Sequence, residues 1–144
     1  MRLFTQDTKV DALKRAPLFD GLLKKELVDL ARRAEDLEAP EGTVLCKEGD
    51  IGREFFVLMD GTVVVTAKEK RIATLGAGDF IGEIALLEQV PRMATVTAKT
   101  PVRFFVLSRE DFRHVVKQHP TVESKVLRTL ALRLVELSRD PTVA

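Results

Sequence analysis

The chain of 144 residues has few of the residues that covalent cross-links and aromatic ligand cages need. It has one cysteine, Cys46, so an internal disulfide is excluded, and it has neither tryptophan nor tyrosine. No apolar run approaches the ~18–20 residues of a membrane-spanning helix. The first ten residues are too polar for a secretory signal. These absences predict a cytoplasmic protein with no membrane partner.

The chain also lacks an excess of charge of either sign. The formal net charge is +1, from 23 basic and 22 acidic residues, and this balance gives no field that would gather a nucleic acid. The two histidines, His114 and His119, have no cysteine, aspartate or histidine at metal-ligand spacing in the sequence. We therefore predict no nucleic-acid partner, no metal, no cofactor, no catalytic residue and no enzymatic activity.

The pattern of apolar residues divides the chain into three zones. Residues 10–37 have helical spacing, residues 38–108 alternate short β-branched and aromatic runs with glycine-containing turns, and residues 109–139 return to helical spacing. Many short strands with glycine-rich turns indicate a sandwich, jelly roll or barrel. We predict one mainly β domain over residues 1–144, with helices before and after it.

Local signals refine this outline. Asp60-Gly61, between two apolar runs, predicts a β-hairpin. Ser108 and Asp111 resemble a capping box, and Pro120 suits the first turn of a second helix that ends near Ser138. That helix carries leucines at the 3, 4, 3 spacing of a coiled-coil seam, which favours either a homodimer or packing on the chain's own barrel: Leu127, Leu130, Leu134 and Leu137.

Two charged residues flank one short segment in the strand-rich zone. Arg92 follows Pro91, which restricts the backbone, and its planar fork of donors matches phosphate oxygens. Glu83 follows Gly82 and accepts hydrogen bonds, so it suits a hydroxyl donor rather than an anion. A helical turn over "EIALLE" would direct backbone N–H groups at the same anion. A small phosphorylated sugar fits these groups.

A simpler interpretation of the same residues stays open at this point. Glu83 and Arg92 can pair with each other on the surface, where such an ion pair contributes only about 0–1 kcal/mol. In that case neither residue would have a ligand.

The segment "GAGDFIGEIALLEQVPRMATVTA", residues 76–98, resembles the phosphate-binding cassette of cyclic nucleotide-binding domains. Both halves of the cassette pattern, G-E followed by A-L-L and P-R-x-A-T-V, stand at the family's spacing. The resemblance covers roughly residues 13–138, with the cassette at residues 78–96. It implies an eight-stranded β jelly roll with N-terminal helices and a C-terminal helical lid.

The resemblance also implies a role for each matching residue. Arg92 would bind the exocyclic oxygens of the cyclic phosphate, and Glu83 would accept from the ribose 2′-hydroxyl. The remaining cassette residues would supply backbone groups or shape the pocket: Gly78, Phe80, Gly82, Ile84, Ala85 and Ala94.

The base side of the site is less defined. Relatives that prefer cGMP often have a threonine directly after the cassette arginine, where this chain has Met93, so cAMP is expected; cGMP or another cyclic nucleotide stays open. Thr95 is expected on the same face as Met93. The resemblance implies a base lid on the C-terminal helix, with four candidate residues: Arg133, Leu134, Leu137 and Ser138.

The sequence thus predicts a regulatory module in signal transduction that binds cAMP and moves its flanking helices. One alternative is the sensor part of a cAMP-dependent transcription regulator whose DNA-binding domain is absent. Another is a module for a different nucleotide. The initial Met1 and the ending "SRDPTVA" favour a complete short chain that acts on an effector in trans, whereas a fragment would act on a domain in cis.

Overall fold

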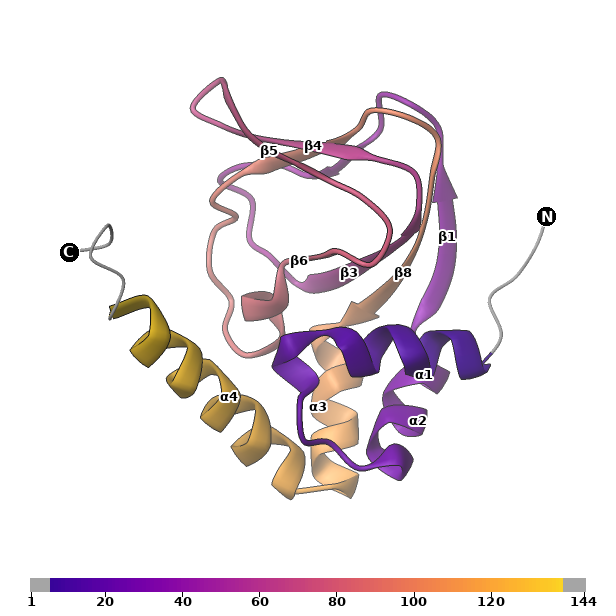
Figure 1. Ribbon diagram of the computed structural model, residues 1–144, viewed down its shortest axis with the longest axis vertical. Helices are drawn as coiled ribbons and strands as arrows, with labels where there is room; N and C mark the ends of the chain where they lie inside the picture. The colour runs from indigo at the N-terminus through magenta and orange to yellow at the C-terminus, as the bar shows by residue number, and fades with distance from the viewer. Residues whose placement is uncertain (1–5, 139–144) are drawn as a thin grey trace.

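The computed structural model describes residues 6–138 and places two β-sheets above a group of helices (Figure 1). The helices are α1 (Gln6–Arg15), η1 (Pro17–Phe19), α2 (Lys24–Arg33), η2 (Glu83–Leu86), α3 (Arg109–Gln118) and α4 (Thr121–Ser138). The strands are β1 (Glu35–Ala39), β2 (Val44–Cys46), β3 (Glu54–Asp60), β4 (Val63–Ala67), β5 (Lys70–Leu75), β6 (Phe80–Ile81), β7 (Thr95–Ala98) and β8 (Val102–Ser108).

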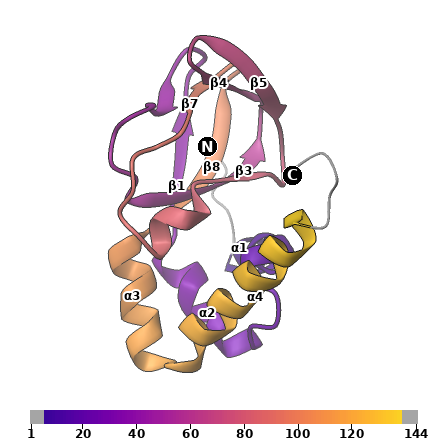
Figure 2. The same ribbon diagram turned by 90° about the vertical axis from the view of Figure 1, so that its left-hand side faces the viewer.

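The eight strands form two antiparallel sheets of four. One sheet has the order β1-β8-β3-β6 and the other has the order β2-β7-β4-β5. The predicted architecture, a β jelly roll with helices before and after it, is confirmed. Figure 2 shows that α1, α2, α3 and α4 all lie at one end of the strands.

Strands β3 and β8 separate two hydrophobic cores. Phe55 on β3 and Phe105 on β8 belong to the core shared with the helices, whereas their chain neighbours Phe56 and Phe104 belong to the core between the sheets. Successive side chains of a strand point to opposite faces, so a strand covered on both faces has a continuous apolar run. This explains why both strands contain the run Phe-Phe-Val-Leu.

The predicted hairpin at Asp60-Gly61 needs correction. Asp60-Gly61 does not form a hairpin, because β3 and β4 belong to different sheets and Gly61 turns the chain from one to the other. Gly61 has φ +92°, and a Cβ there would collide with the Pro101 carbonyl oxygen. The tight hairpin joins β4 to β5, where Lys68 and Glu69 both have positive φ, as a type I′ turn requires.

The boundaries at the N-terminal side also differ from the prediction. Helix α1 begins at Gln6, and β1 begins at Glu35 instead of residue 38. The sequence of β1, Glu-Asp-Leu-Glu-Ala, has no β-branched residue, and Leu37 is its one large apolar residue. This strand is held by its register along β8 at the sheet edge, so its own composition gives little signal.

The start of α3 agrees with its predicted capping signal, and α4 begins at Thr121, directly after Pro120. The Ser108 hydroxyl accepts a hydrogen bond from the Asp111 N–H at 3.1 Å, as the capping prediction requires. On α4, Val122 and Val126 are buried in the helical core, and Leu130 packs against it, whereas Leu127 is 50% exposed. The side chains of Leu134 and Leu137 lie outside the described residues.

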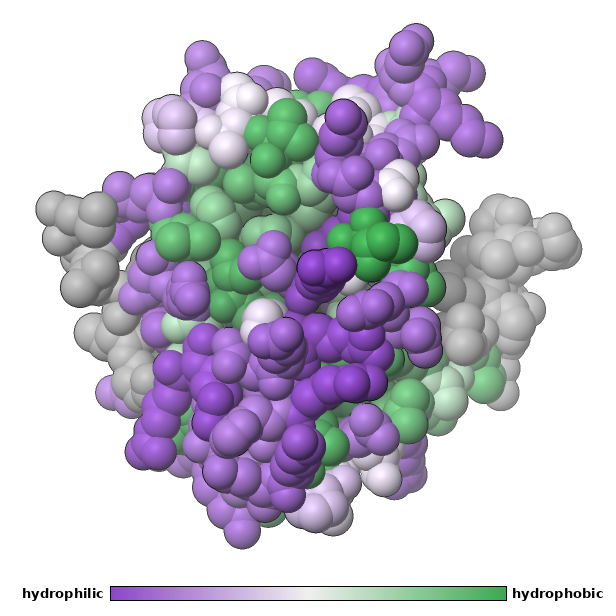
Figure 3. Space-filling model, turned by 180° about the vertical axis from the view of Figure 1, so that it is seen from behind, coloured by the Kyte–Doolittle hydropathy of each residue, from purple (hydrophilic) through white to green (hydrophobic). Residues whose placement is uncertain are grey.

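The surface reflects the division between sheets and helices. On the face seen in Figure 3, hydrophobic residues gather over the strands, and the part over the helices is mostly hydrophilic. Among residues 6–138, no helix has the length and apolar content to cross a membrane.

Glu26 on α2 is a buried charge that links the N-terminal helices to α4. Its carboxylate accepts hydrogen bonds from the Leu23 N–H at 2.7 Å, from the Lys125 ammonium at 2.9 Å and from the Thr121 hydroxyl at 3.3 Å. Burial alone would raise the pKa of Glu26, but these hydrogen bonds and the Lys125 charge outweigh burial and lower the pKa. The ionised carboxylate therefore stabilises the fold.

We expect this stabilisation to disappear in acid. Because the folded-state pKa of Glu26 is below its usual value of 4.5, the contribution is present above that pH and is lost as the pH falls through the folded-state pKa. Glu26→Gln should reduce the free energy of unfolding at pH 7 by about 1–3 kcal/mol and flatten its decline below pH ~4.5. Urea unfolding between pH 3 and 7 measures both effects. The exposed Glu41→Gln is the control, and equal curves for the two variants would contradict this assignment.

Candidate functional site

A cavity of about 360 Å³ opens between the cassette segment and the sheet of β2, β7, β4 and β5. Its volume is in the range of pockets that hold small organic ligands. Its walls are mainly apolar, with Val65, Leu75 and Val96 from this sheet and Phe80 and Ile81 from β6. The side chains of Glu83 and Arg92 add charge to this apolar lining.

The helical turn predicted after Gly82 is present as η2. Gly82 has φ +78°, a conformation that glycine adopts without the strain of a side chain. The Ala85 N–H donates to the Gly82 carbonyl at 3.0 Å, which closes the turn, and Ala85 and Leu86 are buried beneath it. Packing of these two residues therefore fixes the direction of the segment that begins with Glu83.

Arg92 is held at both its backbone and its side chain. Its N–H donates to the Asp50 carbonyl at 2.7 Å, and its own carbonyl accepts from the Gly49 N–H at 2.8 Å. Its Nη2 donates to the Glu54 carbonyl at 2.7 Å, and its guanidinium lies 5.8 Å from the centroid of the Phe56 ring. Among the described residues, Glu54 accepts from one of the five guanidinium donors, so most of the fork can serve a phosphate.

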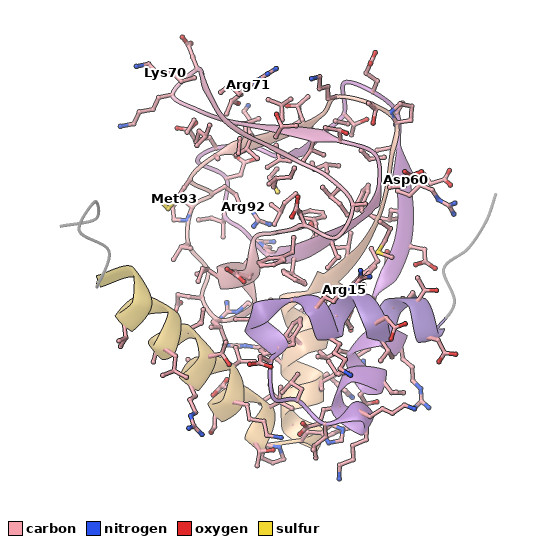
Figure 4. All side chains as sticks on the ribbon, viewed as in Figure 1. Arg15, Asp60, Lys70, Arg71, Arg92 and Met93 are labelled. Carbon is pink, nitrogen blue, oxygen red and sulfur yellow. The ribbon has the colours of Figure 1, made fainter. Side chains whose placement is uncertain are left out.

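The positions of Arg92 and Met93 differ clearly. Figure 4 shows Arg92 within the outline of the strands and Met93 at their outer edge. Met93 is 88% exposed, so its side chain lies at the mouth of the cavity and not in its interior. Arg92 can therefore contact a ligand inside the cavity, whereas Met93 can contact a group that lies across the cavity mouth.

The cavity brings together most of the residues that the sequence predicted. Glu83 lines it, and so do six others: Gly82, Ile84, Ala85, Arg92, Met93 and Ala94. Phe80 forms part of its wall as expected, and Gly78, with φ +92°, lies in the turn before β6.

Thr95 is the exception. It does not line the cavity, and its hydroxyl accepts a hydrogen bond from the Glu48 N–H at 3.0 Å. Thr95, which was expected in the site, therefore does not contribute to the lining of this cavity. Val96, the next residue of β7, points into the core between the sheets, so strand alternation directs Thr95 outward.

The four candidate lid residues all fall on α4. The backbone of this helix is described as far as Ser138, but the side chains of Arg133, Leu134, Leu137 and Ser138 lie outside the described residues. Their contact with a ligand therefore stays a prediction.

Sequence reasoning missed the part of the site at the start of β3 and in the loop before it. Gly52, Glu54 and Phe56 all contact the Arg92 side chain, although they are about 40 positions away in the chain. Glu54 contributes a backbone oxygen and Gly52 has no side chain, so neither has a chemical signature in the sequence. The signal that was available is the second glycine of "EGDIGREFF", which follows Gly49 in the same loop.

Comparison with known proteins identifies the family. The model of the cyclic nucleotide-binding domain matches residues 37–119, which include the whole cassette and every described residue of the cavity. The chain belongs to the cyclic nucleotide-binding domain family. The prediction made from the cassette motif is thereby confirmed.

Several relatives have this domain within longer chains. A cyclic nucleotide-gated potassium channel of Rhizobium etli is 34% identical over 113 residues, which are 78% of this chain and 32% of that protein. A cAMP-dependent protein kinase regulatory subunit of Yarrowia lipolytica is 36% identical over 106 residues, which are 72% of this chain and 28% of that protein. The chain thus spans a third or less of these two relatives.

A solved structure shows the same fold. The N-terminal domain of a transcriptional regulator from Streptomyces coelicolor superimposes with a TM-score of 0.81 at 31% identity, covering 89% of this chain and 93% of that one. This agreement extends beyond the stretch matched by the family model, which begins at residue 37 and ends at residue 119.

Cys46 is a buried thiol in the wall of the same cavity. Burial raises the pKa of Cys46, and although the positive charge of Arg92 opposes this, the negative charge of Glu54 adds to it. Because the thiolate is the reactive form, the folded protein should protect this residue from alkylation. Cys46 therefore acts as an apolar part of the wall.

The reactivity of Cys46 tests its placement. We expect iodoacetamide to alkylate the folded chain at pH 8 at least about tenfold more slowly than the chain unfolded in urea, because burial limits both access and thiolate formation. Mass spectrometry of samples quenched over time gives the two rates. Equal rates would show that Cys46 is exposed and does not belong to the cavity wall.

Proposed function

We propose that the chain is a cAMP-binding regulatory module that performs no chemistry on its ligand. One observation carries this proposal: the Arg92 guanidinium is fixed at the wall of an apolar cavity beside the backbone of Gly82 and η2. A cation held in this way fits a cyclic phosphate, and the apolar wall fits a base and sugar. Glu83, at the head of η2, would accept from the ribose 2′-hydroxyl.

The preference for cAMP over cGMP rests on the position after the arginine. Met93 has no hydrogen-bond donor and lies at the cavity mouth, where it would face the base. A guanine there would find no hydroxyl partner from this residue. The relatives fit either nucleotide, since they include a cAMP-dependent kinase regulatory subunit and a cGMP-dependent protein kinase of Eimeria tenella.

The fold offers a packed connection between the cavity and the helices. Phe80 of the cavity wall lies 6.0 Å from Phe55, and Phe55 lies 5.6 Å from Phe19 of η1, with both distances between ring centroids. Phe19 also packs on Phe112 of α3, at 6.3 Å. A ligand that shifts Phe80 would therefore act on the helical core, provided that it binds the two helix arrangements with different affinity.

Helix α4 is the element that would carry the signal outward. Its first turns are fixed by Val122 and Val126 in the helical core. Farther along, Leu132 and Val135 are 56% and 45% exposed. We propose that this part of α4 closes over the base with its lid residues, and that its exposed apolar residues meet an effector domain, a separate partner or a second copy of the chain.

Removing the Arg92 side chain tests the ligand assignment. Arg92→Ala should weaken cAMP binding by at least about 3 kcal/mol, which is more than a hundredfold in Kd, because the bound phosphate would lose its paired charge. Isothermal titration calorimetry with cAMP and with cGMP measures this loss and the preference between the two nucleotides.

A matched arginine controls for the loss of charge. Arg71 is exposed on β5 and lies far from Arg92 in Figure 4, so Arg71→Ala should leave the affinity unchanged. A loss of less than threefold for Arg92→Ala, or equal losses for both variants, would refute the phosphate role. Tighter binding of cGMP than of cAMP by the unmodified chain would refute the base preference.

A further inference from the structure

Gly52 lies in the loop between β2 and β3 and forms the surface on which the Arg92 guanidinium rests. A Cβ atom at Gly52 would lie 2.9 Å from both Cζ and Nε of Arg92, and 3.2 Å from its Cδ. Side-chain carbons do not approach this closely in folded proteins, so any other residue at position 52 must displace the arginine. Gly52 is itself buried, so a side chain added there has no open space to occupy instead.

The backbone at position 52 does not require glycine for its conformation. The φ angle of Gly52 is not positive, so an alanine can adopt the same dihedral angles without strain. Gly82 differs, because its φ is +78° and a Cβ there would collide with Arg92 Nη1 and lie 2.9 Å from the Glu54 carbonyl oxygen. Contact with Arg92, and not backbone conformation, is therefore the reason for a glycine at position 52.

We propose that Gly52 is a positioning residue for the ligand phosphate: its missing side chain sets where the Arg92 guanidinium lies. This inference rests on the proposed binding of a cyclic phosphate by Arg92. Phosphate binding then also depends on Gly52, a residue that has no side chain with which to contact the phosphate. The role belongs to the loop that precedes β3 and not to the cassette.

The same loop holds the backbone of Arg92 independently of its side chain. Asp50 accepts from the Arg92 N–H, Gly49 donates to the Arg92 carbonyl, and the Gly52 N–H donates to the Val90 carbonyl at 3.0 Å. A methyl group at position 52 removes none of these main-chain hydrogen bonds. It therefore acts on the orientation of the guanidinium while the arginine backbone stays in place.

The displaced atoms belong to the flexible end of a long side chain, which decides the expected consequence. Rotation of Arg92 relieves the clash at the cost of its contacts with the Glu54 carbonyl and the Phe56 ring, so the fold should tolerate the change. Phosphate binding should not tolerate it, because a bidentate fork depends on direction as well as charge. A displacement of about 1 Å in such a site can lower function by as much as a hundredfold.

Alanine substitution separates these two effects. Gly52→Ala should reduce cAMP affinity about tenfold or more in isothermal titration calorimetry, with Tm changed by less than about 3 °C. Gly76→Ala is the matched control, because Gly76 also lacks a positive φ and a Cβ there would meet only the Gly61 carbonyl at 3.9 Å. It should bind cAMP as the unmodified chain does.

A double-mutant cycle tests whether Gly52 acts through Arg92. In an Arg92→Ala background, adding Gly52→Ala should change affinity by less than about twofold, because the group that it displaces is gone. An affinity of Gly52→Ala within threefold of the unmodified chain would overturn the proposal. So would an undiminished loss in the Arg92→Ala background, or unfolding of Gly52→Ala.

An unliganded measurement keeps this proposal separate from the ligand assignment. If the unmodified chain binds neither cAMP nor cGMP, the proposed function fails, but the position of Arg92 can still be observed. The Arg92 Nε–Hε signal in a ¹H–¹⁵N spectrum should shift in Gly52→Ala and stay in place in Gly76→Ala. Unchanged signals in both variants would overturn the positioning role of Gly52.

Discussion

Strands β3 and β8 bury side chains on both of their faces, and this constraint organises the rest of the molecule. The helices bury one of these faces. Residues such as Phe55 and Leu107 pack in one core with α1, α2, α3 and the start of α4, which lie at one end of the sheets. The other face needs the second sheet, and Phe56 and Phe104, with ring centroids 5.8 Å apart, pack against it. Neither core is complete without the strands that they share.

The site depends on the same strands. Glu54 begins β3 and accepts from Arg92, and Phe56, two residues later, lies beneath the guanidinium. Between them Phe55 points the opposite way, into the core shared with the helices. A group that binds at Arg92 therefore acts on β3, and the opposite face of β3 packs against the helices. A sensor needs this arrangement if ligand binding is to change helix positions.

Much of the site could be predicted because its charged groups lie close together in the sequence. Gly82, Glu83 and Arg92 stand within eleven residues, and the helical turn η2 and the loop before β7 bring them to the same cavity. The three zones were visible for a similar reason, since helical and strand periodicity are local properties. Thr95 was expected in the site but lies outside the cavity lining, because alternation along β7 turns Val96, and not Thr95, toward the core between the sheets.

The parts that could not be predicted depend on distant contacts. The sequence at Gly61 is typical of a hairpin, and the change of sheet there follows only from the pairing of β3 and β4 with strands that are distant in the chain. A glutamate is usually a surface residue, and the burial of Glu26 depends on its pairing with Lys125, 99 positions later. Gly52 has no side chain, so its importance appears only when the arginine 40 positions away is placed against it.

The proposed function requires that a cyclic phosphate binds between Arg92 and the head of η2. A ¹H–¹⁵N titration of the chain with cAMP tests this most directly, because each backbone amide and the Arg92 Nε report separately. If the phosphate binds there, saturable shifts are expected at Gly82–Ala85, at Ala94 and at Arg92 Nε. Saturation of signals elsewhere while these stay unchanged, or no shift at any cAMP concentration, would contradict it.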